Sequence, residues 1–324
     1  MEKLTLEIEK FALDREKFKQ IARRLEKGKR VAFWPSEASI RLPGPILVGK
    51  CHRALWWDFK GQPISNLMDG RGWRTISAGI AFENLLVENL KQMNLWNTKM
   101  NDIKKFYNKD LNISGEADAF INWEGQSVGL EIKTMYGWFA RKQIFMQRIP
   151  KLEHLLQTGL YIYHFGIPFK LIYNCRDTQE ITEFDISLKD KNLIVVDNDL
   201  FKIQSVSISG IKERFEKFQE ALNKDEMPPR DYSVLGMTKE ELEIQKALGK
   251  LSKNDTLALK EGRKILKIPW QCSYCSYFHF CRDQARQESG QKGRDELSFI
   301  DENKRLKNQN VEERQFSESR KRKK

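Results

Sequence analysis

The apolar positions along the chain alternate between helical and strand periodicity. Apolar residues spaced three and four apart predict amphipathic helices, whereas alternating or short continuous apolar runs predict strands. In chain order we expect a helix over 1–30, a half-buried helix over 77–90 with Leu85, Leu86 and Leu90 inward, two strands within 111–134, a long helix over 140–165 kinked at Pro150, a strand over 169–175, strands over 180–187 and 193–206 with a turn at Asn198, a helix over 208–222 and a helical stretch over 238–266. The strand-strand-helix-strand order that begins at residue 111 predicts an α/β fold.

The stretch 111–134 is predicted to be a β-hairpin, and the rest of the fold is organised around it. Residues 123–126 separate its two apolar halves and predict a tight turn. Side chains alternate faces along a strand, so Leu130 and Ile132 are expected to point into a core. The residues that alternate with them then share the opposite face.

Three charged residues of this hairpin form a candidate metal-dependent site. Glu131 and Lys133 share one face of the second strand, and the hairpin brings Asp118 of the first strand near them. Carboxylate oxygens are ligands that Mg²⁺ and Mn²⁺ prefer, and a neighbouring lysine can orient a water or steady phosphate charge. This chemistry suits phosphodiester hydrolysis. A Glu-x-Lys pair on a solvated strand edge has the same local sequence, so other motifs must decide between the two interpretations.

The helix expected over 140–165 carries further candidates. Gln157 and Tyr161 are four residues apart and therefore share a helix face that can lean over the site. Arg141, Lys142 and Arg148, on the approach to this face, are either phosphate contacts or part of a solvated charged surface.

The totals of the chain favour a nucleic-acid partner inside the cell. Its 324 residues, 40% hydrophobic and 31% charged, suit one elaborated globular domain or one domain with small appendages. A net charge of +12 favours a polyanionic partner, because cations near phosphates release condensed counterions. No apolar run is long enough to span a bilayer, and the N-terminus lacks the apolar core of a signal peptide. We therefore expect a cytoplasmic protein with no membrane association.

Three of the five cysteines lie in one short segment and predict a metal centre. Cys272, Cys275 and Cys281 are too crowded to be core filler, and structural disulfides are rare inside cells. Zinc and an iron-sulfur cluster both take four cysteine ligands, and this compact trio needs a remote fourth. Cys175 lies in an apolar strand and is interpreted as a core thiol, and Cys51, by itself, as a small hydrophobe.

Together the motifs resemble the PD-(D/E)XK nuclease superfamily, specifically its RecB-like branch. Over residues 33–283 they occur in the family's order: Gly79-x-x-x-Glu83, Gly115-x-x-Asp118, Glu131-x-Lys133, Gln157-x-x-x-Tyr161, and Cys51 set apart from Cys272, Cys275 and Cys281. Phe82 departs from the pattern, because many RecB-like nucleases have a metal-binding histidine there. Other branches, including phage lambda-type exonucleases, use the Gly-x-x-x-Glu pattern instead, which makes Glu83 a candidate third carboxylate.

The resemblance implies a restriction-endonuclease-like fold, in which a mixed central sheet is flanked by helices. It implies a site with these roles: Glu83, Asp118, Glu131 and the Ile132 carbonyl as ligands of Mg²⁺ or Mn²⁺, Lys133 orienting the attacking water, and Gln157 and Tyr161 contacting DNA or positioning active-site groups.

The cysteine pattern is similar to that of CRISPR-associated RecB-like and AddB-type exonucleases. That likeness implies a 4Fe-4S cluster on Cys51, Cys272, Cys275 and Cys281, with Zn²⁺ as the alternative and His52 and His279 as substitute ligands. Such a cluster would clasp the N- and C-terminal segments together, and its binding would help to drive folding.

The function that the resemblance implies is a metal-dependent deoxyribonuclease, an exonuclease on single-stranded DNA ends. Its setting would be recombination, repair or CRISPR adaptation, with protein partners in such a complex. Two alternatives stay open: a catalytically silent DNA-binding or scaffold subunit, and a zinc-containing nucleic-acid-binding protein. We expect a helix over 1–30, a nuclease domain over 31–283, and a charged tail over 284–324 that is poorly ordered or partly helical.

Overall fold

The structure is a computed structural model that describes residues 30–42, 46–197, 206–247, 251–263, 265 and 267–289. The chain divides into two compact units, Met1–His279 and Phe280–Lys324. Residues 1–29 of the helix expected over 1–30, the turn at Asn198 and the tail beyond residue 289 lie outside the described residues.

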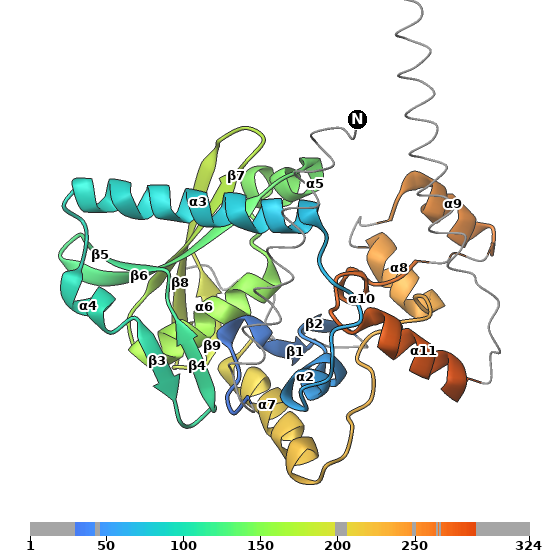
Figure 1. Cartoon of the computed structure of the whole chain (residues 1–324). Coiled ribbons are helices and arrows are strands. Elements are labelled where there is room, and N and C mark those ends of the chain that lie inside the picture. Colours follow the sequence, from blue (N-terminus) through green and yellow to red (C-terminus); the bar gives the residue numbers. More distant parts are fainter. Residues whose placement is uncertain are drawn as a thin grey trace, which may run out of the picture. The chain divides into compact units, whose positions relative to one another are not determined.

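The first unit alternates helices and strands, as the periodicity predicts (Figure 1). Its N-terminal elements are η1 (Pro35–Glu37), β1 (Ser39–Arg41), β2 (Leu47–Gly49), α2 (His52–Phe59), α3 (Gly70–Gln92) and α4 (Thr98–Asp102). The central elements are β3 (Lys105–Asn108), β4 (Ile113–Glu116), β5 (Ala119–Trp123), β6 (Gln126–Met135), α5 (Trp138–Arg141), a π-helical turn η2 (Lys142–Met146), α6 (Leu152–Phe165), β7 (Phe169–Cys175), β8 (Ile181–Lys189) and β9 (Leu193–Val196). The last are α7 (Ile208–Asn223), α8 (Lys239–Ala247), α9 (Lys253–Lys260), α10 (Trp270–Ser273) and α11 (Phe278–Glu288), which continues into the second unit.

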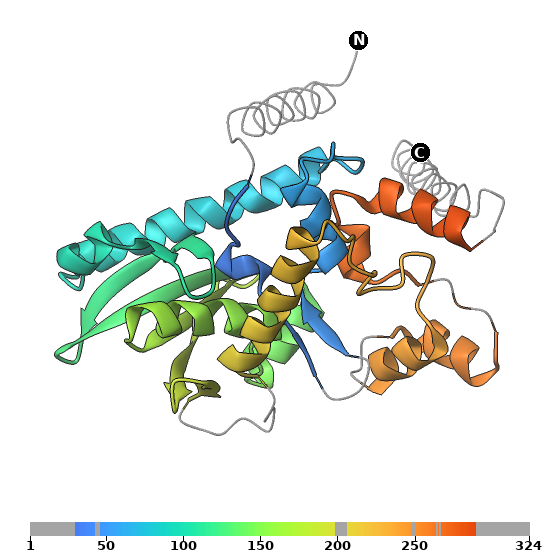
Figure 2. The same ribbon diagram turned by 90° about the horizontal axis from the view of Figure 1, so that it is seen from below.

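A mixed five-stranded sheet lies at the centre of the first unit, in the order β5-β6-β7-β8-β9. Strands β6 and β7 are parallel, and α6 connects them; the other neighbours are antiparallel. Figure 2 shows the sheet between α3 on one face and α6 on the other. A mixed α/β sheet flanked by helices is thus confirmed. None of the described helices combines the length and the apolar character needed to cross a membrane.

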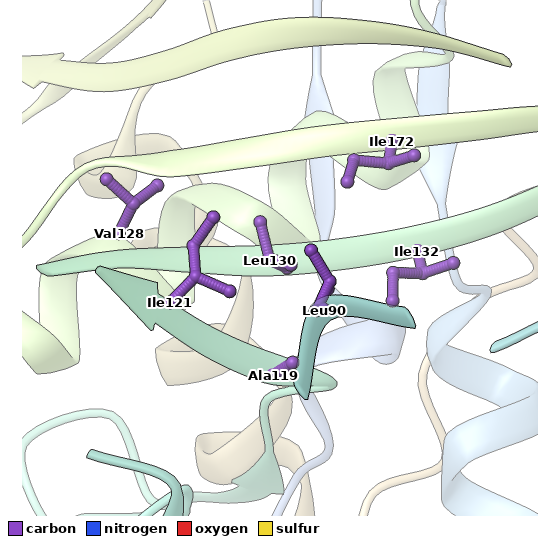
Figure 3. Close-up of a cluster of buried hydrophobic side chains, with 7 residues drawn as sticks. All are labelled: Leu90, Ala119, Ile121, Val128, Leu130, Ile132 and Ile172. Atoms are coloured by element: carbon purple, nitrogen blue, oxygen red, sulfur yellow. The ribbon is translucent and has the colours of Figure 1, made fainter. Parts of the chain in front are cut away.

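The core between α3 and the sheet gathers side chains from β5, β6 and β7 (Figure 3). Leu130 and Ile132 belong to it, which confirms the predicted inward face of β6. Leu86 and Leu90 of α3 pack against the same cluster, together with Phe82. The prediction for Leu85 is wrong: its side chain is exposed, because the inward stripe of α3 follows the other positions and leaves Leu85 beyond its edge.

The predicted hairpin is confirmed at its turn, but its first strand is divided. Glu124 and Gly125 both have positive φ, the signature of a tight turn whose twist matches that of the strands. Before it, β4 pairs with β3 in a separate two-stranded sheet, while β5 pairs with β6. Ala117 and Asp118 stand at the division, so the strand changes partner immediately before the candidate metal ligand.

The long helix expected over 140–165 is broken rather than kinked. After the π-helical turn, Arg148 adopts φ 55° and α6 begins only at Leu152. Pro150 has no backbone N–H to donate, and it disfavours helical geometry at the residue before it. The stretch 238–266 is likewise divided into α8 and α9, and β9 ends at Val196, short of the predicted strand end.

Candidate active site

The change of strand partner fixes the carboxylate of Asp118 against β6. Its Oδ2 accepts a hydrogen bond of 2.6 Å from the backbone N–H of Ile132. The preceding residue, Ala117, donates its N–H to the carbonyl of Lys104 at 3.1 Å. Asp118 is therefore held beside Glu131 and Lys133 by backbone contacts, and the predicted convergence of these residues is present.

Glu131 and Lys133 project from the face of β6 that α6 covers, opposite the core of Figure 3. Glu131 is fully buried. The ammonium of Lys133 forms an ion pair with its Oε1, but neither carboxylate oxygen of Glu131 accepts a well-formed hydrogen bond from any described residue. Buried carboxylates in proteins almost always have several hydrogen-bond donors, whereas Glu131 has one cationic partner among the described residues, Lys133.

The pKa values of Glu131 and Asp118 are raised, because both carboxyls are buried in a site crowded with negative charge. Burial raises the pKa of Glu131 to about 8, and the carboxylate of Asp118 adds to the rise. Burial also raises the pKa of Asp118, against the pull of Lys133 and the Ile132 N–H. Burial lowers the pKa of Lys133, but Glu131 and Asp118 together bring it above its ordinary value. A second cation at this point would relieve both carboxylates.

Glu83 reaches the same charges from α3. Burial raises the pKa of the Glu83 carboxyl, with Asp118 as the next cause and Lys133 opposing it. One turn earlier, a Cβ added at Gly79 would lie 3.2 Å from Oγ1 of Thr134, so the helix approaches β6 closely here. The Gly-x-x-x-Glu spacing thus has a physical reason: a small residue at the contact lets the glutamate lie beside the site.

Gln157 and Tyr161 share a face of α6, as predicted. The side-chain amide of Gln157 donates to the Tyr161 hydroxyl at 3.0 Å, and that hydroxyl donates to the carbonyl of Glu116 at 3.1 Å. Burial raises the pKa of Tyr161, with the charge of Glu131 as the next cause, so the phenol stays protonated. These contacts tie α6 to the end of β4, just before Asp118.

Two polar residues of this region escape sequence reasoning. Lys104 forms an ion pair of 2.9 Å with Glu116 and its Nζ lies 3.4 Å from the carbonyl of Asp118. His154 is half-buried on α6, one turn before Gln157, and its Nδ1 lies 2.9 Å from the hydroxyl of Tyr173. His154 and Gln157 are three residues apart on α6, which is the only sequence signal that would have pointed to the histidine.

The acidic residues suit a divalent ion by their chemistry. Among the residues that the structure describes, no three His, Cys, Asp or Glu side chains are arranged closely enough to hold a metal ion. The fit rests on the donors instead: Glu131 has two buried oxygens without hydrogen bonds, and Asp118 and Glu83 add carboxylates with raised pKa values. Hard oxygen donors of this kind are what Mg²⁺ and Mn²⁺ take.

Apart from Cys175, the cysteines of the first unit lie in two segments. Cys51 immediately precedes α2, and burial raises the pKa of its thiol to about 11. The segment with Cys272 and Cys275 is bound to the loop after α2, where the N–H groups of Ser65 and Asn66 both donate to the carbonyl of Ser276 at 2.9 Å. Hydrogen bonds thus join the N-terminal and C-terminal segments directly.

The four-cysteine cluster stays a prediction. Cys281 belongs to the second unit, so the structure gives no geometry for a site that would include it. Cys175 is fully buried in β7, which confirms it as a core thiol. The predicted domain boundary at residue 283 falls inside α11.

Fold and side chains together define a mixed α/β protein with a buried acid-lysine site on its central sheet. No protein-family model matches the chain, and no curated protein matches its sequence. Among solved structures, the crystal structure of a protein designated SSO0001 is similar at 15% identity and a TM-score of 0.42, over 85% of this chain and 96% of that one. An alkaline exonuclease, LHK-Exo, from Laribacter hongkongensis is similar at 13% identity and a TM-score of 0.25, over 44% of this chain and 57% of that one. Both likenesses are too remote to assign the chain to a family.

Proposed function

We propose that this protein is a metal-dependent deoxyribonuclease, with exonuclease action on single-stranded DNA ends as the preferred mode. The observation that supports it most is Glu131, a fully buried carboxylate whose one charged partner among the described residues is Lys133, beside the anchored Asp118. A buried charge cluster of this kind costs stability, and such costs are concentrated at functional sites.

In this proposal, Asp118, Glu131 and Glu83, with the Ile132 carbonyl, hold Mg²⁺ or Mn²⁺. When bound, the ion lowers the pKa of a coordinated water and neutralises a scissile phosphate. Lys133 keeps its proton, because the carboxylates raise its pKa, so it acts as a hydrogen-bond donor that orients water and stabilises phosphate charge rather than as a base.

Residues of α6 position the site in this proposal. Tyr161 remains a neutral phenol that donates to the Glu116 carbonyl, and Gln157 holds that hydroxyl in place. The pair thereby fixes the strand end from which Asp118 follows. The Gln157 amide has a second N–H that it can donate to a DNA strand that enters from the α6 side.

The test is a nuclease assay with Mn²⁺ on end-labelled single-stranded, double-stranded and circular DNA. We expect Glu131→Ala and Lys133→Ala to lose at least about a hundredfold in rate, the scale that removal of one electrostatic stabiliser costs. Lys170→Ala is the matched control, because Lys170 lies on the neighbouring strand and pairs with Glu183 and Asp185 outside the site. Resistance of circular DNA would support exonuclease action. Equal digestion by all four proteins would exclude the site from the mechanism.

Phe82 favours a second candidate, a catalytically silent DNA-binding or scaffold subunit. Its ring packs against the core of α3 and the sheet, so it offers no ligand at the position where many RecB-like nucleases have a histidine. In that case the protein would bind DNA and leave every substrate intact with Mn²⁺, and Glu131→Ala would bind DNA as the wild type does.

We also propose that Cys51, Cys272, Cys275 and Cys281 hold a 4Fe-4S cluster. The hydrogen bonds from Ser65 and Asn66 to Ser276 support the proposal, because they hold the C-terminal cysteine segment against the chain that follows Cys51. Protein purified without oxygen would be brown with broad visible absorbance, whereas a zinc protein would be colourless. Cys272→Ser should lose that colour and Cys175→Ser should keep it, since Cys175 lies in the core.

A further inference from the structure

Three aromatic side chains stand exposed immediately after the strand that carries the site. Tyr136, Trp138 and Phe139 are 50%, 58% and 78% exposed, and we call them the aromatic shelf. Tyr136 follows the end of β6 directly, three residues beyond Lys133. Aromatic rings usually contribute large buried areas, so three of them in solvent beside a candidate active site call for a partner with flat apolar faces.

The backbone of the shelf is held in place from both sides. Gly137 has φ 86°, and its N–H donates to the carboxylate of Asp177. The guanidinium of Arg176 lies 4.9 Å from the centre of the Tyr136 ring and donates to the carbonyl of Thr75 on α3 at 3.3 Å. The shelf is therefore a preformed surface between α3 and the loop after β7 (Figure 1).

Two of the chain segments beside the shelf contain no acidic residue, whereas the loop after β7 carries Asp177 and Glu180. Residues 70–82 of α3 contain no Asp or Glu, and neither do residues 132–152, which include the shelf. Cations occur in both segments, among them Arg71 and Lys142, which are exposed. Arg141 and Arg148 have carboxylate partners on Glu180 and Asp197, outside these segments. The charged side chains of these two segments are all basic, which complements a polyanion.

We propose that the aromatic shelf stacks unpaired bases of single-stranded DNA whose backbone runs toward Glu131 and Lys133. Exposed rings interleaved with cations are the combination that binds single strands, because every base has a π-face while the phosphates need positive charge. A duplex keeps its base faces inside the helical stack, so it gains little from the rings. The inference rests on the proposed deoxyribonuclease function and gives its preference for single strands a physical cause.

The test measures binding without cleavage. A fluorescein-labelled oligonucleotide, single-stranded or annealed to its complement, is titrated with the full chain in EDTA, and anisotropy gives Kd. We expect Trp138→Ala with Phe139→Ala to weaken single-strand binding by about tenfold or more, the scale of one or two lost base stacks, and to change duplex binding little. Trp138→Phe keeps a ring and should stay within a few-fold of wild type.

Trp123→Ala is the matched control. Trp123 is an exposed ring with Lys170 at 6.0 Å, but it lies at the end of β5, next to the turn at the opposite end of β6. The Trp123→Ala variant should bind the single strand and the duplex as the wild type does. Because the shelf residues are exposed, their replacement should leave the melting temperature unchanged, and a melting curve for each variant verifies this.

Two outcomes would overturn the stacking role: unchanged single-strand affinity in the double variant, or an equal loss for single strand and duplex. If the wild type were a dimer and the double variant a monomer, the shelf would instead be assigned to contact with a second copy of the chain. A failure of the nuclease proposal would look different. If the wild type bound single strands through the shelf but cleaved no DNA with Mn²⁺, the stacking role would stand and the proposed deoxyribonuclease function would not.

Discussion

Two buried carboxylates of the first unit, Asp231 and Glu131, have opposite surroundings. Asp231 Oδ1 accepts from Arg41 at 2.9 Å, and its Oδ2 accepts from Arg214 and from the backbone N–H of His52, both at 2.8 Å. Glu131 is buried at least as deeply, yet among the described residues it has only the ion pair with Lys133 and no well-formed hydrogen bond. Both are acids in a protein interior, and they differ in how many donors they have.

The difference separates structure from function. A fully satisfied buried carboxylate fixes the elements that supply its donors, here β1, the start of α2 and α7. An unsatisfied one raises its own pKa and destabilises the folded state unless a cation arrives. Asp231 is therefore interpreted as a structural centre beside Cys51, and Glu131 as a ligand site. Three substitutions test this comparison.

The largest effect is expected for Asp231→Ala. Removal of the carboxylate leaves Arg214 buried and strips the His52 N–H of its acceptor, so unfolding free energy should fall by about 3–5 kcal/mol, as when one partner of a buried ion pair is removed. Urea denaturation followed by circular dichroism measures it. Asp225→Ala is the control, because the carboxylate of Asp225 is exposed and pairs only with Lys60 on the surface. Similar losses in both variants would contradict the structural role of Asp231.

Glu131→Gln should act in the opposite direction on stability. The folded-state pKa of Glu131, about 8, lies above its ordinary 4.5, so between these pH values the folded protein holds a proton that the unfolded chain has released. The contribution of Glu131 to stability therefore falls as pH rises through this window. In chelator, Glu131→Gln should be more stable than wild type by about 1–3 kcal/mol near pH 8, with no advantage at pH 4.

Mn²⁺ provides the control for this reversal. An ion bound to the carboxylates stabilises the folded state of wild type, so the melting temperature of wild type should rise with added Mn²⁺, while that of Glu131→Gln should rise less. A variant that is less stable than wild type in chelator at pH 8 would show that Glu131 is a structural residue like Asp231.

Local pattern predicted the elements whose cause is local. Alternation along β6 placed Leu130 and Ile132 in the core, and the tight turn predicted at residues 123–126 is present, with positive φ at Glu124 and Gly125. The division of the first strand was not predictable in this way. Ala117 and Asp118 continue an apolar-polar alternation, yet the strand changes partner there, and the Asp118 carboxylate rather than a backbone carbonyl accepts the Ile132 N–H.

Some residues of the candidate site could be predicted from local sequence, and others could not. Asp118, Glu131, Lys133, Gln157 and Tyr161 were reached through short motifs with fixed spacing. Lys104 and His154 were not, because their contacts with Glu116 and Tyr173 join elements whose pairing no short window of sequence contains. Sequence spacing also could not foresee that the face of β6 opposite the core would be covered by α6, which makes Glu131 buried rather than solvated.

The smallest effect is expected for Tyr161→Phe. This variant removes one hydroxyl next to the candidate site and leaves the charged residues of the site in place. The variant loses the hydrogen bonds to the Glu116 carbonyl and from Gln157, and should lose about 1–2 kcal/mol of unfolding free energy because both partners are part-buried. Tyr107→Phe is the matched control, since its hydroxyl bonds to Asn112 at the exposed surface and should cost less than about half that amount. If Tyr161 also positions the strand end before Asp118, Tyr161→Phe should lower the Mn²⁺-dependent rate without changing DNA affinity in EDTA. Equal stability and rate in the two variants would remove Tyr161 from both roles.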